Sequence, residues 1–140
     1  MTMCWSVTDQ TDPNVALSGL TGSNGFRLRG EAADHAGQVV GSAGDVNGDG
    51  FDDLLISAPY AAPHGANSGS VYVVFGSSAP FAASTFLSTL DGSTGFRLDG
   101  SVANAYAGGH AAGVGDVNGD GFDDLLFSVD ANGVSAGASA

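Results

Sequence analysis

Two stretches of this 140-residue chain are identical, because residues 44–55 recur without a change as residues 115–126, 71 positions later. The segment 23–30 also recurs at 93–100, with six of its eight residues identical. Twelve consecutive identities inside one chain do not arise by chance, so the chain holds two copies of a unit of about seventy residues. Such self-similarity is typical of repeat architectures, in which each unit buries its apolar face against a neighbour.

Short apolar runs bounded by Gly, Asn and Asp predict β-strands. In the first unit we expect strands at 25–28, 38–43, 54–57 and 71–75, and in the second at 95–98, 111–114 and 125–128. No stretch repeats its apolar residues at a helical period. The composition agrees, since 23 residues are Gly and all but one of the 15 acidic residues are Asp, both poor helix formers. About four short strands per unit predict an all-β fold built from β-propeller blades.

The second unit is less complete than the first. The strand expected at 71–75 has no counterpart, because its equivalent would begin at position 142, and residues 131–140 are a small-residue, low-complexity tail. We therefore expect a disordered N-terminal leader over 1–14, a first repeat over 15–84 and a truncated second repeat over 85–140. Two units cannot close a ring, and open blade edges invite association. The chain is thus predicted to be a fragment, or a subunit that pairs with others.

The charge balance excludes several classes of partner. Three Arg and no Lys stand against 15 acidic residues, giving a formal net charge of −12. Binding a nucleic-acid backbone or an anionic membrane surface requires clustered positive charge. The longest apolar run, 71–75, has five residues and is too short for a membrane span. The start of the chain lacks the features of a signal peptide, and the single Cys4 cannot form an intrachain disulfide.

The duplicated block carries the pattern of a calcium-binding loop. Oxygen-bearing side chains fall at loop positions 1, 3, 5 and 9, a backbone carbonyl at position 7 and a glycine at position 6. Clustered carboxylates repel one another unless a cation lies between them, and oxygen donors without His, Cys or Met favour Ca²⁺ over transition metals. The predicted ligands of the first ion are Asp45, Asn47, Asp49, the carbonyl of Phe51, and Asp53. Those of the second are Asp116, Asn118, Asp120, the carbonyl of Phe122, and Asp124.

These loops differ from the helix–loop–helix calcium site, which requires a glutamate at position 12. That position holds the apolar residues Ile56 and Phe127, and the flanking segments are predicted strands. Asp53 and Asp124 should therefore close each site at position 9, inside a β-hairpin. Asp52 and Asp123, at position 8, are expected to face solvent. The alternative interpretation is a tight Asn/Gly/Asp turn that holds no metal.

No residue pattern indicates catalysis. His35, His64 and His110 lie far apart in loops, and no carboxylate stands alone in an apolar run where its pKa would rise. Residues 133–137 fit a Gly-x-Ser-x-Gly pattern but lack the strand–turn–helix context and the downstream acid and histidine that a nucleophile elbow requires. We expect a protein that is not an enzyme.

The repeated unit resembles the FG-GAP repeat of integrin α-chain β-propellers, and more closely its bacterial versions. The matching pieces are the Gly-Phe-Arg-Leu at 25–28, the Ala-Gly at 36–37, the calcium block at 44–54, the Ser-Ala-Pro at 57–59 and the strand at 69–76. The resemblance covers residues 15 to 130 and implies four-stranded blades, seven to a ring, with Ca²⁺ in hairpin loops on one face and protein binding on the other. The second unit departs from the pattern at 128–130, where Ser-Val-Asp replaces Ser-Ala-Pro.

The resemblance predicts an incomplete propeller of about two four-stranded antiparallel blades. It implies a calcium-binding, non-catalytic segment of a secreted or cell-surface protein, for adhesion or for binding a protein or glycan ligand. Further FG-GAP repeats or self-association would complete the fold. One alternative is an accessory propeller of a secreted hydrolase whose catalytic domain lies outside this chain. Another is a dockerin-like calcium module, which would be helical.

Overall fold

The computed structural model describes residues 2–3 and 16–130, and in this part the chain is all-β. The strands are β1 (Thr2–Met3), β2 (Arg27–Arg29), β3 (Val40–Gly44), β4 (Asp53–Ala58), β5 (Ser70–Val74), β6 (Ser84–Phe86), β7 (Gly95–Asp99), β8 (Ala111–Gly115) and β9 (Asp124–Phe127). Two single 3₁₀ turns, η1 (Leu17–Gly19) and η2 (Leu87–Thr89), are the helical elements of the described chain. The seven strands expected from the sequence are confirmed, each within two residues at its ends.

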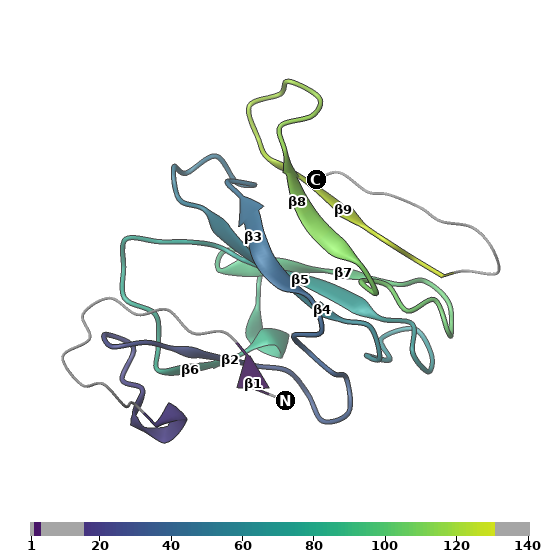
Figure 1. Cartoon of the computed structure of the whole chain (residues 1–140), viewed down its shortest axis with the longest axis horizontal. Coiled ribbons are helices and arrows are strands. Elements are labelled where there is room, and N and C mark those ends of the chain that lie inside the picture. Colours follow the sequence, from purple (N-terminus) through teal and green to yellow (C-terminus); the bar gives the residue numbers. More distant parts are fainter. Residues whose placement is uncertain (1, 4–15, 131–140) are drawn as a thin grey trace.

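A four-stranded antiparallel sheet in the order β3-β4-β5-β7 forms the centre of the molecule (Figure 1). Its last strand, β7, belongs by sequence to the second repeat and pairs with β5 from Ser70↔Asp99 to Val74↔Gly95. The blade is therefore offset from the sequence repeat, with three strands from one unit and one from the next. This offset covers an edge of β5 that would otherwise expose unpaired backbone groups.

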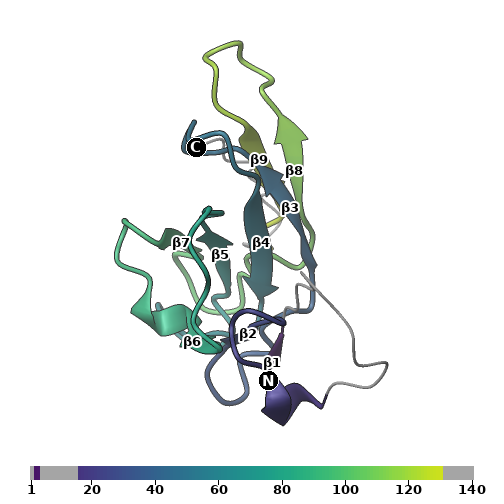
Figure 2. The ribbon, with the colours of Figure 1, turned by 90° about the vertical axis from the view of Figure 1, so that its left-hand side faces the viewer.

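The second repeat contributes an antiparallel hairpin of β8 and β9, which lies beside β3 (Figures 1 and 2). Within the described residues, this two-stranded hairpin represents the expected second blade. A third sheet joins β1, β2 and β6, and its β2–β6 pair is parallel. The sheets are open, and their antiparallel strands are those of propeller blades.

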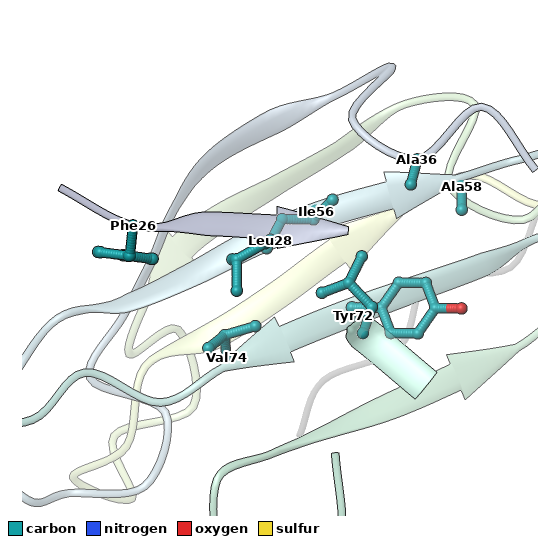
Figure 3. Close-up of a cluster of buried hydrophobic side chains, with 8 residues drawn as sticks. Phe26, Leu28, Ala36, Ile56, Ala58, Tyr72 and Val74 are labelled. Atoms are coloured by element: carbon teal, nitrogen blue, oxygen red, sulfur yellow. The ribbon is translucent and has the colours of Figure 1, made fainter. Parts of the chain in front are cut away.

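The central sheet buries a cluster of apolar side chains on each face, because alternate residues of β4 and β5 point to opposite sides. One cluster packs against the sheet of β2 and β6, and Figure 3 shows Leu28 of β2 beside Ile56 of β4. Its members are Phe26, Leu28, Ala36, Ile56, Ala58, Tyr72, Val74 and Leu87. The other cluster packs against the β8–β9 hairpin and consists of Ala43, Val46, Leu55, Val71, Val73 and Leu125. All five residues of β5 are buried, which explains why an uninterrupted apolar run, 71–74, follows Ser70 in this strand.

In the part of the chain that the structure describes, neither short helix has the length and apolar character to cross a lipid bilayer.

Candidate metal-binding loops

Each duplicated loop connects the two strands of a hairpin, β3 to β4 and β8 to β9, as the sequence predicts. The first loop turns at Gly48 and Gly50, whose φ angles of 75° and 89° lie in the left-handed region that favours glycine. In the second loop Gly119 and Gly121 have φ angles of 76° and 92°. The two loops therefore share one backbone conformation.

The carboxylate of Asp45 organises the first loop through hydrogen bonds from the backbone. Its Oδ1 accepts from the N–H groups of Gly48 (2.7 Å) and Asp49 (3.0 Å), and its Oδ2 accepts from the N–H of Gly50 (2.9 Å). The N–H of Asp49 also donates to Oδ1 of Asn47, at 3.0 Å. Because oxygens of Asp45 and Asn47 share this donor, the structure brings the candidate ligands at positions 1 and 3 together.

Asp53 occupies a different environment from the other candidate ligands of the first loop, since its side chain is 0% exposed at the start of β4. Its carboxylate accepts hydrogen bonds from the backbone N–H groups of Val46 (2.9 Å) and Gly76 (2.8 Å). Burial raises the pKa of Asp53, these two hydrogen bonds lower it, and the negative charges of Asp49 and Asp45 raise it further. Burial is the largest of these effects, and the pKa of Asp53 is raised overall.

The second loop repeats this hydrogen-bond pattern. Oδ1 of Asp116 accepts from Gly119 (2.7 Å) and Asp120 (3.1 Å), and its Oδ2 accepts from Gly121 (2.9 Å). Oδ1 of Asn118 accepts from the N–H of Asp120, at 2.9 Å. The hydrogen bonds from the loop backbone, that of Gly121 foremost, lower the pKa of Asp116. The two loops therefore present the same set of oxygens.

The loops differ at position 9. Asp124 is buried like Asp53, and its Oδ2 accepts from the N–H of Val117 at 2.9 Å. Its Oδ1 is buried without a hydrogen-bond partner among the described residues, whereas Oδ1 of Asp53 is bonded to Gly76. A buried carboxylate oxygen without a donor is unfavourable unless a positively charged or hydrogen-bonding group reaches it.

The donor chemistry of both loops fits a hard cation, because the candidate side chains supply only carboxylate and amide oxygens. The arrangement of these side chains around a metal position is less complete than their chemistry. In the described part of the chain, no three His, Cys, Asp or Glu side chains are grouped so that they could hold a metal ion. Positions 1, 3 and 5 share one hydrogen-bonded turn. The position-9 carboxylate accepts from the backbone N–H of Val46 in the first loop and of Val117 in the second. The rings of Phe51 and Phe122 are exposed at position 7.

One contact overturns a prediction from the sequence. Asp123, expected to face solvent, accepts a hydrogen bond at Oδ2 from the backbone N–H of Asp45 (2.8 Å) and donates its own N–H to the carbonyl of Asp45 (3.0 Å). Its counterpart Asp52 is exposed as expected. The two positions have identical sequence surroundings, so no signal in the sequence distinguishes them.

Of the three histidines, His35 lies against aromatic side chains. The ring of His35 packs on Tyr60, with centroids 4.6 Å apart, and Tyr60 meets Tyr106 edge-on at 5.6 Å. The Gly-x-Ser-x-Gly pattern at 133–137, the tail 131–140 and Cys4 lie outside the described residues, as does the expected leader 1–14 apart from β1.

Comparison with known proteins agrees with this geometry. Residues 32–74, from the loop before β3 to the end of β5, match the family model described as FG-GAP repeat. A 41-residue stretch, 29% of the chain, is 46% identical to integrin alpha pat-2 of Caenorhabditis elegans. The aligned part is 3% of that relative's length, so the likeness concerns one repeat of a much longer protein. Neither match tests the expected bacterial type.

Proposed function

We propose that this chain, whose residues 32–74 match the FG-GAP repeat model, is a calcium-binding, non-catalytic propeller segment that serves adhesion or the binding of a protein or glycan ligand. The observation that carries this proposal is the identity of the two loops. Twelve residues recur unchanged, and the same oxygens accept the same backbone hydrogen bonds in both copies.

In this proposal the first ion is held by Asp45, Asn47, Asp49, the carbonyl of Phe51, and Asp53. The second is held by Asp116, Asn118, Asp120, the carbonyl of Phe122, and Asp124. A divalent cation at each loop would offset the repulsion among its carboxylates and change the formal net charge from −12 to −8. The chemistry that calcium would supply is structural, because it would tie the two strands of each hairpin together.

An extracellular or cell-surface location fits this role. The integrin relative supports such a location, and extracellular calcium modules bind with dissociation constants on the order of 10⁻⁴ to 10⁻³ M. Further FG-GAP repeats, or self-association, would complete the propeller. The non-catalytic part of this proposal is supported by the match to the FG-GAP repeat and by the likeness to an integrin alpha chain.

Calcium titration calorimetry tests the proposal. We expect two bound ions per chain in the wild type and none in Asp49→Ala/Asp120→Ala, which loses one ligand from each loop. The control is Asp52→Ala, which removes a carboxylate from the same loop at an exposed position that is not a proposed ligand. Circular dichroism verifies that the variants remain folded. A wild type that binds no calcium, or a double variant that binds as the wild type does, overturns the proposal.

A further inference from the structure

We propose that Asp123 is a positioning residue for the first loop, so that two loops of identical sequence bind calcium with different affinities. This inference rests on the proposed calcium binding. It concerns a residue that is not itself a proposed ligand, and it predicts that the first loop binds more tightly than the second.

The first step is the pair of hydrogen bonds between the loops. Asp123 holds both polar groups of the Asp45 backbone, because its carboxylate accepts from the N–H (2.8 Å) and its N–H donates to the carbonyl (3.0 Å). The side chain of Asp45 in turn accepts the three backbone hydrogen bonds that shape the first loop. Asp123 thus fixes the residue on which the loop's conformation depends.

Further contacts place the first loop against the second. A Cβ added to Gly44, which precedes Asp45, would collide with the carboxylate of Asp123. A Cβ at Gly48 would lie 2.7 Å from Cε1 of Phe122. The backbone of the first loop therefore contacts two consecutive residues of the second, at positions 7 and 8.

The second loop has no equivalent support among the described residues. Asp52, the counterpart of Asp123, is exposed, and no hydrogen bond to its carboxylate is found in this part of the chain. Added Cβ atoms at Gly115 and Gly119, the counterparts of Gly44 and Gly48, would meet nothing within 4 Å. The contacts between the loops hold the second loop at positions 7 and 8, whereas in the first loop they hold the backbone of Asp45, a proposed ligand. Among the described residues, only the first loop therefore has its position-1 residue fixed by the other loop, and a preorganised site loses less conformational entropy when a ligand binds.

Nuclear magnetic resonance separates the two loops in one titration. The backbone amide signals of Gly50 and Gly121, at position 6 of each loop, report calcium binding at the first and second loop respectively. In the wild type we expect the first loop to bind roughly five- to tenfold more tightly, the order of one intramolecular hydrogen bond. In Asp123→Ala the first loop should lose this advantage.

Two variants separate positioning from charge. Asp52→Ala removes a carboxylate from the first loop itself, where a purely electrostatic effect would be stronger, and should change its affinity less than about twofold. Asp123→Asn loses the charge but keeps an oxygen that can accept from Asp45, so it should retain most of the advantage. Without calcium, hydrogen exchange of the Asp45 amide should accelerate in Asp123→Ala and remain unchanged in Asp52→Ala.

The outcomes distinguish this inference from the proposed function. If neither glycine signal responds to calcium in the wild type, calcium binding is refuted and the inference fails with it. If both loops bind with equal affinity, or if Asp52→Ala weakens the first loop as much as Asp123→Ala does, calcium binding stands and the positioning role of Asp123 is refuted.

Discussion

Oδ2 of Asp123 lies 2.8 Å from the backbone nitrogen of Asp45, a residue 78 positions earlier in the chain. This hydrogen bond joins the end of β3 in the first repeat to the start of β9 in the second. Strand β8, the hairpin partner of β9, lies beside β3 in Figure 2. It also makes the repeats unequal, because Asp52, in the same sequence surroundings, faces solvent. The duplication therefore supplies matched pairs of residues that differ only in what surrounds them.

The close approach of β8 to β3 depends on Gly113. A Cβ there would lie 2.6 Å from the carbonyl oxygen of Ser42 and 2.8 Å from the carbonyl carbon of Ala43, which are backbone atoms that cannot rotate away. We expect Gly113→Ala to destabilise the protein by about 1–3 kcal/mol through overpacking. Urea denaturation measures this change in the free energy of unfolding.

Gly41→Ala is the control, because Gly41 lies in β3 and an added Cβ would meet nothing within 4 Å. It should leave stability within about 1 kcal/mol of the wild type or raise it slightly, since alanine restricts the unfolded chain. Equal losses for the two variants would contradict the packing of β8 against β3.

Leu55 and Leu126 are equivalent in the repeat but unequal in burial. Leu55 is 1% exposed between the central sheet and the β8–β9 hairpin, whereas Leu126 is 54% exposed on the outer side of that hairpin. Leu55→Ala should cost about 2–5 kcal/mol through lost burial and the cavity left behind. Leu126→Ala should change stability by about 0.5 kcal/mol or less, as surface substitutions do. Thermal unfolding of both variants measures the difference, and similar losses would mean that the repeats do not pack as described.

The same two residues mark how far the sequence could predict the fold. Short apolar runs and turn residues located seven strands and both loops, because these are local properties of each unit. Leu55 and Leu126 have identical neighbours, so their different burial depends on which unit packs on which face. The hydrogen bond between Asp123 and Asp45 could not be predicted from the sequence for the same reason. Strand β6 was missed because Ser84–Phe86 has no alternating pattern and is fixed by parallel pairing with β2.

The candidate metal-binding loops are an intermediate case. The sequence located the candidate ligands and their hairpin setting, and the structure brings Asp45 and Asn47 onto a shared backbone donor. The sequence could not predict that the carboxylate of Asp53 accepts a hydrogen bond from Gly76, which lies beyond the end of β5 and 23 residues away. That bond depends on the pairing of β4 with β5, and the described residues supply no equivalent for Asp124.

Asp91 provides a test that does not involve calcium. Its carboxylate accepts hydrogen bonds from the hydroxyl (2.7 Å) and N–H (2.9 Å) of Ser93 and from the N–H of Thr94 (3.3 Å), and these lower the pKa of Asp91. A carboxyl whose pKa is lower in the folded state stabilises the fold above its unfolded pKa. This contribution is lost as the pH falls through the folded pKa.

The carboxyl ¹³C signal of Asp91, followed by nuclear magnetic resonance during acid titration, should give a pKa below the usual range of aspartate. Ser93→Ala removes the hydroxyl donor and should move that pKa towards its ordinary value. An ordinary or raised pKa in the wild type would contradict the turn seen at residues 91–94.

The central claim is that the duplicated loops bind calcium and thereby stabilise the fold. Its most direct test is a thermal melt of the wild type followed by circular dichroism, first in excess Ca²⁺ and then in excess chelator. A ligand that binds only the folded state adds about 2.7 kcal/mol at a concentration one hundred times its dissociation constant. We predict a β-type spectrum whose melting temperature is clearly higher with calcium. The same melting temperature in both conditions would mean that the loops are turns without a metal.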